Sequence, residues 1–128
     1  MKAQVKFITF CDYAMLSQDN KLSIMGIFDQ VNIQKFPGAL ARAFFVAMIK
    51  TEPNTKKTFS IQGKLGNKMI FPPVTMNGVV GESGSHNIIV DVKGIGFPEE
   101  GKYEFSLSQD GEEVGSTELI VKEYEQSN

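Results

Sequence analysis

The residue types that could support nucleophilic catalysis meet at one place, around the single histidine of the chain. Ser83 and Ser85 precede His86 in the run Gly-Glu-Ser-Gly-Ser-His. A serine becomes a nucleophile when a positioned base accepts its proton. Neighbouring residues on an extended chain point to opposite faces, so Ser85 and His86 do not form a dyad by spacing. The run also lacks the arrangement of a G-x-S-x-G elbow. We therefore expect no catalytic residues and no enzymatic activity.

Metal and cofactor sites have equally little to build on. The chain has one cysteine, Cys11, and one histidine, which are too few for a Cys/His zinc site or an internal disulfide. Gly94-Ile95-Gly96 lacks the third glycine of a dinucleotide-binding turn, and Phe97-Pro98 follows it instead of a helix start. Residues 108–113 are acidic but lack the alternating ligands of a calcium loop. We expect no metal and no cofactor.

Length and charge indicate an ordinary globular domain, which we place at residues 1–128, with a formal net charge of −2. The charge is uneven: residues 42–68 carry six cations against one carboxylate, and residues 69–128 carry three against eleven. Such an uneven charge could steer a partner or allow two copies to pair. The alternative is that these charged side chains are simply solvated on the outer faces of strands. Arg42 is the only arginine and tryptophan is absent. The chain therefore has few residues of the types that bind phosphate groups in a bidentate manner or stack on bases. We expect no nucleic-acid partner.

The sequence also argues against membrane insertion. No apolar run approaches the roughly 20 residues of a membrane-spanning helix. Asp12 interrupts the apolar stretch near the N-terminus, and the large Phe10 before Cys11 does not suit lipid attachment. We expect a cytoplasmic protein with no membrane contact and a reduced, buried Cys11 thiol.

Most segments alternate apolar and polar residues with a period of two, which is typical of half-buried strands. Segments with a strand pattern are 4–10, 22–28, 30–34, 57–65, 87–93, 102–108 and 113–122. Their number and spacing predict an all-β fold: an immunoglobulin-like antiparallel β-sandwich of about seven to nine strands.

Two segments fit this pattern less well. Residues 39–50 are apolar on both faces, which suits either a helix or a central strand buried on both sides. We favour a strand for Ala43–Lys50 because its neighbours are strands. Asp12–Leu16 has the composition of one short helical turn between the first two strands.

Strand register makes further predictions near the C-terminus. The apolar residues of 103–107 must share a face with Leu119 and Val121, which requires odd residues to pair with odd residues. A three-residue loop over 109–111 achieves this, so we predict a type I turn followed by a left-handed Gly in a G1 bulge. The apolar positions switch from even to odd at Gly94, which predicts a bulge or a strand end there.

Gly101 and Tyr103 form a further recognisable pattern. A turn with Gly two residues before a Tyr that opens an alternating strand is typical of the tyrosine corner of immunoglobulin-like sandwiches. Phe105 stands where disulfide-bonded domains carry a Cys. The alternative is an ordinary strand with a buried Tyr.

Three stretches together carry a family resemblance: Phe10-Cys11-Asp12-Tyr13-Ala14, the segment 20–28, and the segment from Phe97-Pro98 to Asp110-Gly111. They resemble an uncharacterised bacterial family of short single-domain proteins, a domain of unknown function with an immunoglobulin-like β-sandwich. The resemblance covers nearly the whole chain and implies the fold, but it implies no catalytic residues. Asn20 stands where the family often has Gly, so we expect a less tight turn there.

The segment 66–85 is long, and its middle is apolar around a Pro-Pro pair. Pro-Pro cannot lie in a central strand, so this segment is an edge strand or a loop, and Asn77-Gly78 predicts a hairpin turn. An apolar edge either packs over the core or is offered to a partner. The candidate interaction surface consists of Met69, Ile70, Phe71, Pro72, Pro73, Val74 and Met76.

These observations predict a non-enzymatic β-sandwich that acts through protein contact, by self-association or as an accessory subunit. The alternative is a small-ligand-binding or hydrolytic sandwich with a pocket near residues 66–86.

Overall fold

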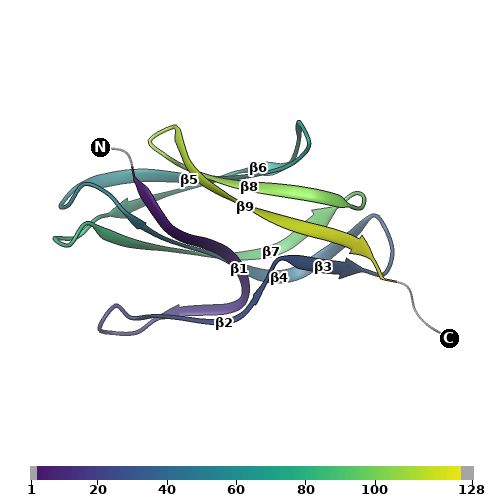
Figure 1. The fold of residues 1–128 in the computed structure, drawn as a ribbon, viewed down its shortest axis with the longest axis horizontal. Coiled ribbons are helices and arrows are strands. Elements are labelled where there is room, and N and C mark those ends of the chain that lie inside the picture. The colour runs from purple at the N-terminus through teal and green to yellow at the C-terminus, as the bar shows by residue number, and fades with distance from the viewer. Residues whose placement is uncertain (1–2, 125–128) are drawn as a thin grey trace.

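The computed structural model describes residues 3–124, with only the backbone of Phe71 and Pro72, and places their strands in two sheets (Figure 1). The first sheet, in the order β2-β1-β4-β7, contains β1 (Gln4–Leu16), β2 (Leu22–Phe28), β4 (Gly38–Lys50) and β7 (Ser85–Phe97). The second sheet, in the order β3-β9-β8-β5-β6, contains β3 (Gln30–Ile33), β5 (Lys56–Leu65), β6 (Lys68–Val79), β8 (Gly101–Gln109) and β9 (Glu112–Glu123). The all-β prediction is confirmed for the described residues.

One strand pair departs from the predicted antiparallel arrangement. β3 runs parallel to β9, with Val31 opposite Val121. Only Asp29 separates β2 from β3, and its carbonyl accepts a hydrogen bond from the Ile120 amide at 2.9 Å. The chain therefore passes from the first sheet to the second at Asp29 without reversing.

β4 is an inner strand of the first sheet, between β1 and β7. Phe45 and Ala47 belong to the main core, whereas Phe44 and Val46 belong to a smaller cluster. All four side chains are at most 5% exposed. The strand prediction for Ala43–Lys50 is confirmed, and the helix alternative is wrong. Burial on both faces explains why this segment lacks a polar alternation.

The predicted helical turn at Asp12–Leu16 is wrong, because these residues continue β1 and pair with β2. Ala14 lies opposite Ile24, and Leu16 lies opposite Leu22. A local composition that favours a helical turn is overridden here by a full set of cross-strand pairs.

The main core lies between the two sheets and centres on aromatic side chains. Phe10 of β1 contacts Phe45 and Phe105 edge-on, with ring centroids 5.4 Å and 4.7 Å apart. Edge-to-face aromatic packing adds to the free energy of burial. The core therefore joins β1 and β4 of one sheet to β8 of the other.

The β8–β9 hairpin reaches the predicted register by a different route. Gln109 pairs with Glu112, so the loop has two residues, and both Asp110 and Gly111 have positive φ (49° and 87°), as in a type I′ turn. The register shifts after the second pair, so that Tyr103 lies opposite Leu119 as the core requires. The odd-with-odd pairing is thus confirmed, whereas the three-residue loop is wrong.

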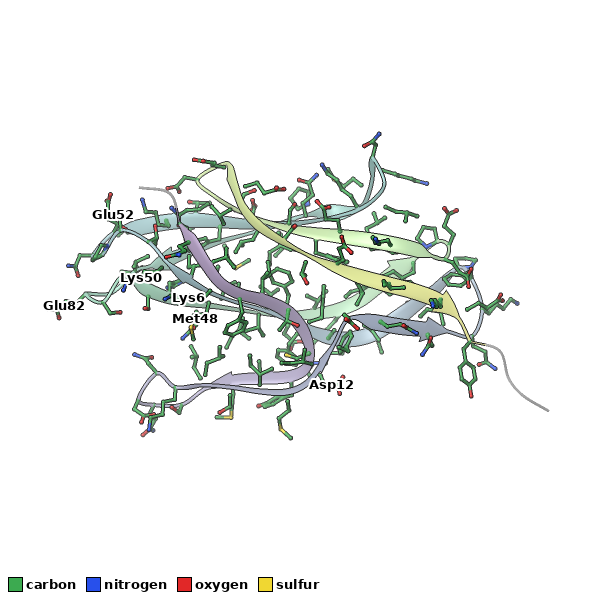
Figure 2. The ribbon with its side chains drawn as sticks, viewed as in Figure 1. Lys6, Asp12, Met48, Lys50, Glu52 and Glu82 are labelled. Carbon is green, nitrogen blue, oxygen red and sulfur yellow. The ribbon has the colours of Figure 1, made fainter. Side chains whose placement is uncertain are left out.

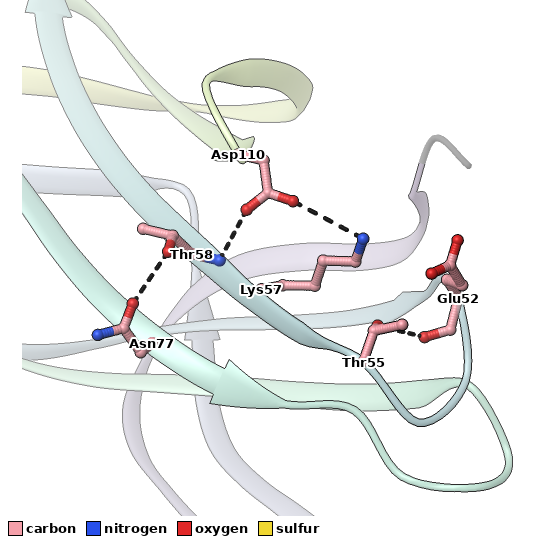
Figure 3. A network of polar contacts seen from close by, with 6 residues as sticks. All are labelled: Glu52, Thr55, Lys57, Thr58, Asn77 and Asp110. Carbon is pink, nitrogen blue, oxygen red and sulfur yellow. Dashed lines mark hydrogen bonds and ion pairs between the residues drawn. The ribbon is translucent and has the colours of Figure 1, made fainter.

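The turn is held against β5 by the side chain of Asp110 (Figure 3). Its carboxylate accepts the Thr58 amide at 2.9 Å and lies 3.7 Å from Nζ of Lys57. Thr58 in turn hydrogen-bonds Asn77 of β6 at 2.9 Å between their side chains. The network ties the β8–β9 turn to β5 and, through Thr58, to the edge strand β6.

Gly94 interrupts the alternation of β7 without breaking the strand. Its φ is +70°, yet Arg42 pairs with Lys93 and Leu40 with Ile95 in one unshifted register. In β4 the core-facing positions also switch, from Leu40 to Ala43. Because both strands switch together, the predicted bulge or strand end is wrong.

Candidate interaction surface

The end of β1 and all of β2 form a two-stranded ribbon that curves away from the second sheet (Figure 1). The bend lies near Asp12, labelled in Figure 2, and opposite it Gly26 has φ +69°. A left-handed conformation is readily adopted only by glycine and turns the strand locally. Gly26 therefore allows the ribbon to change direction while it keeps its pairing with β1.

The ribbon packs one side against the outer face of the first sheet. Ala14, Leu22 and Ile24 join a cluster with Phe44 and Val46 of β4. Cys11 lies in the same cluster and is fully buried, and burial raises the pKa of its thiol. This second cluster fixes the position of the ribbon relative to β4.

Several large apolar side chains of the ribbon are left exposed. Met25 and Ile27 are each 66% exposed, and Tyr13 and Met15 are also exposed. We call these four residues the ribbon surface; Leu16 is exposed too, but it lies opposite Leu22 on the other side of the ribbon. The ribbon carries five of the nine exposed large hydrophobic side chains among the described residues, so the exposed apolar groups are concentrated here.

The two strands that carry the ribbon surface are paired with each other, and an ion pair lies beside this surface. Tyr13 lies opposite Met25, and its ring contacts Phe44 edge-on at a centroid distance of 5.3 Å. The Arg42 guanidinium lies 5.1 Å from the centre of the Phe44 ring and donates two hydrogen bonds to Asp91, at 2.8 and 2.6 Å. Hydrogen bonding to Arg42 lowers the pKa of the Asp91 carboxyl. An apolar surface thus adjoins a bidentate ion pair.

The segment predicted as the interaction surface forms β6, an edge strand of the second sheet. The edge position is confirmed, but the turn lies at Gly66-Asn67, where Leu65 pairs with Lys68, and not at Asn77-Gly78, which lies within β6. Met69 and Val74 are exposed, and so is Pro73.

The other residues of that predicted surface do not face solvent together. Ile70 and Met76 pack against the main core. The side chains of Phe71 and Pro72 lie outside the described part of the structure. β6 therefore offers a smaller exposed apolar area than the sequence pattern predicts, because an edge strand still covers the core with one face.

The sequence analysis did not identify the ribbon surface, because it predicted a helical turn at 12–16 where the structure has one strand of the ribbon. The signal was the run of apolar residues at both odd and even positions of Leu22–Phe28, which leaves some side chains outside any single core face.

Gly101 and Tyr103 lie at the start of β8. The Tyr103 side chain is fully buried, and its hydroxyl donates a hydrogen bond to the Glu99 carbonyl at 2.5 Å. Burial raises the pKa of this hydroxyl. A Cβ atom on Gly101 would lie 2.8 Å from Cδ1 of Leu65, so the glycine permits close packing of β8 on β5.

His86 lies beside a surface recess of about 500 Å³ at the start of β7. The recess is lined by Leu16, Asn20, Val79, Gly81, Glu82, Ser83, Ser85, His86 and Asn87. Figure 2 shows Glu82 and Glu52 at this end of the molecule.

The imidazole of His86 is half-buried. It stacks on Phe59 at a centroid distance of 5.2 Å and an interplanar angle of 13°, and burial lowers its pKa. The Ser83 hydroxyl accepts a hydrogen bond from the Ser85 amide at 3.1 Å. The described contacts of these residues are therefore packing and backbone contacts.

Residues 3–124 hold no group of three or more His, Cys, Asp or Glu side chains that could share a metal ion. They also contain no helix long and apolar enough to cross a membrane.

The family of unknown function DUF6941 matches residues 6–122, which include nearly all of both sheets. The chain belongs to this family. The resemblance inferred from the sequence is thereby confirmed, and both the ribbon and the recess lie inside the matched range. None of the curated proteins matches the chain.

Proposed function

We propose that this protein is a non-enzymatic binding module that acts through protein–protein contact at the ribbon surface. The observation that carries the proposal is the concentration of exposed apolar side chains on one ribbon, with Met25 and Ile27 each 66% exposed. Contiguous exposed apolar groups on a folded domain are typical of contact sites. Methionine suits such a site because its side chain adapts to different partners.

We further propose that the two sheets are of the immunoglobulin-like type. The support is the buried Tyr103, whose hydroxyl binds the backbone four residues upstream in a strand that lies centrally in the second sheet. A scaffold of this type commonly presents contact surfaces on strands and loops while the core stays unchanged. We place the protein in the cytoplasm of a bacterium, where the buried Cys11 thiol stays reduced.

The absence of enzymatic activity is part of the same proposal. The imidazole of His86 stacks flat on Phe59 and is held by packing, and the Ser83 hydroxyl is used by the backbone of Ser85. A general base needs a hydrogen bond, direct or through one water, to the group that it deprotonates. The contacts of these residues support a structural role.

Site-specific photocrosslinking tests the contact surface. A photoreactive amino acid replaces Met25 in one variant and Met69, an exposed methionine on β6, in a matched variant. We expect protein adducts from position 25 in a lysate of the source organism or in concentrated purified protein. Adducts from position 69 alone would move the contact to β6, and no adduct from either position would refute the proposal.

A second candidate function is small-ligand binding in the recess beside His86. The observation that favours it is the unpartnered, buried Oδ1 atom of Asn87 beside a recess of about 500 Å³. A metabolite screen that follows thermal unfolding tests it, since a ligand stabilises the folded state by mass action. A shift that His86→Phe abolishes would support this function, because the variant keeps an aromatic stack on Phe59.

A further inference from the structure

We propose that a second copy of this chain pairs with the free edge of β2 in an antiparallel manner, centred on Met25. The two four-stranded sheets would then join into one continuous sheet across a twofold axis. This inference rests on the proposed function, because it names the partner that covers the ribbon.

β2 differs from the other edge strands in how its edge is protected. Edge strands usually avoid pairing by being short or by carrying charged residues or proline. β3 has four residues, β6 contains Pro72-Pro73, and β7 carries Asp91 and Lys93. β2 has the sequence Leu-Ser-Ile-Met-Gly-Ile-Phe, with neither charge nor proline, and its one backbone irregularity is the left-handed Gly26 next to the proposed axis. Within the described residues it hydrogen-bonds to β1 on one side, and no strand flanks the other side.

Symmetry restricts the registers in which two copies of β2 can pair. Two identical antiparallel strands are related by a twofold axis perpendicular to the sheet, and residues directly opposite each other share a face. Since the side-chain period is two, a residue must pair with itself or with one an even number of positions away. With Met25 opposite its own copy, Ser23 lies opposite Ile27 and Leu22 lies opposite Phe28.

The charges that flank β2 favour this register. With Met25 on the axis, Lys21 of one copy lies opposite Asp29 of the other, and the contact occurs twice. Moving the partner by two residues in one direction places Asp29 opposite Asp19, which brings like charges together. Moving it in the other direction places Lys21 opposite Val31 and leaves both charges unmatched. Opposite charges stabilise cross-strand pairs, and like charges destabilise them.

The groups needed for this pairing are accessible in the single chain. Lys21 and Asp29 are both exposed. Lys21 pairs with Asp19 at 3.2 Å, but the two side chains are 80% and 63% exposed, and such a pair is weakly held. Lys21 can therefore turn to Asp29 of the second copy. Met25 and Ile27 would lose much of their exposed area in the dimer.

The oligomeric state in solution tests this inference. The mass of the purified protein is measured by light scattering after size exclusion over a range of concentrations, against a chain mass of 14.2 kDa. Pairing along one edge strand is a small interface, so we expect a reversible dimer with a dissociation constant on the order of micromolar. Met25→Lys places two ammonium groups face to face on the axis and should weaken the dimer by at least about tenfold. Met69→Lys is the matched control and should leave it unchanged.

A charge exchange tests the register. Lys21→Asp and Asp29→Lys each place like charges opposite each other, and each should weaken the dimer. The double variant restores opposite charges and should recover most of the wild-type affinity. A monomer at every concentration, equal association of Met25→Lys and Met69→Lys, or no recovery in the double variant would overturn the inference. If position 25 then still crosslinks to a different protein, the proposed contact function stands without the dimer.

Discussion

The carboxylate of Asp12 occupies the space beside the Cα atom of Gly26, on the neighbouring strand of the ribbon. Because Gly26 also has φ +69°, this position combines a left-handed backbone with a neighbouring side chain that an added Cβ atom would have to displace. Gly26 thus allows the bend of the ribbon, which carries the exposed residues Met25 and Ile27.

Gly26→Ala should therefore destabilise the fold by about 2–4 kcal/mol, since left-handed strain and a steric clash add together. Gly94 is the matched control, because it has φ +70° in a strand and open space around it. Gly94→Ala should cost only the strain, about 1–2 kcal/mol. Urea unfolding measures both variants, and equal losses would show that the Asp12 contact is unimportant.

The Asp110 carboxylate should stabilise the β8–β9 turn through the Thr58 amide. Asp110→Ala removes this acceptor and a residue type that tolerates positive φ, so we expect a loss of about 1–2 kcal/mol. Asp110→Asn keeps both an acceptor and the tolerance of positive φ, and its unfolding free energy should stay near that of the wild type. If the two variants unfold alike in urea, the hydrogen bond does not stabilise the turn.

Removing the Tyr103 hydroxyl should cost about 1 kcal/mol, because Tyr103→Phe loses the hydrogen bond to the Glu99 carbonyl while the ring stays buried. Burial raises the pKa of this hydroxyl, so the unfolded chain ionises first. The wild type should then lose stability as the pH rises through about 10, the ordinary tyrosine pKa, and Tyr103→Phe should lack this component. Tyr13→Phe, at a 47% exposed position, serves as the control in denaturant titrations at neutral and alkaline pH.

His86 should make the fold less stable in mild acid. Burial lowers its pKa in the folded protein, so the unfolded chain binds a proton at a higher pH than the folded chain does. The contribution of the neutral imidazole is present above about pH 6.5 and decreases as the pH falls through the folded-state pKa. His86→Phe keeps the ring on Phe59 and should flatten the pH dependence between about pH 7 and pH 5. An NMR titration of the imidazole protons gives the pKa directly, and a value above 6.5 would contradict the prediction.

The backbone of Gly78 lies close to the imidazole of His86, so a substitution at Gly78 also tests the packing of this ring. A Cβ atom on Gly78 would lie 2.6 Å from Nε2 of His86. Gly78→Ala should therefore displace the ring and weaken its stack on Phe59. We expect a lower melting temperature and an imidazole pKa closer to the ordinary value, as measured by calorimetry and NMR; an unchanged pKa would show that the stack survives the substitution.

The sequence alone determined the strand content of this protein, because a period of two in side-chain polarity follows from one buried and one solvated face. It also determined that Tyr103 must share a face with Leu119, since a one-residue slip would turn the core residues outward. The family resemblance rested on the same local patterns.

The tertiary structure alone decided how those requirements are met. A three-residue loop would also pair odd residues with odd residues. The chain instead uses a two-residue loop, in which Asp110 and Gly111 both have positive φ, and shifts the register within the strands. Asp12–Leu16 is a strand because it pairs with β2. This pairing cannot be predicted from the composition of the segment alone. The exposure of Met25 arose in the same way: which apolar side chains remain in solvent depends on where a bent ribbon comes to rest against β4, and this is set by packing between distant segments.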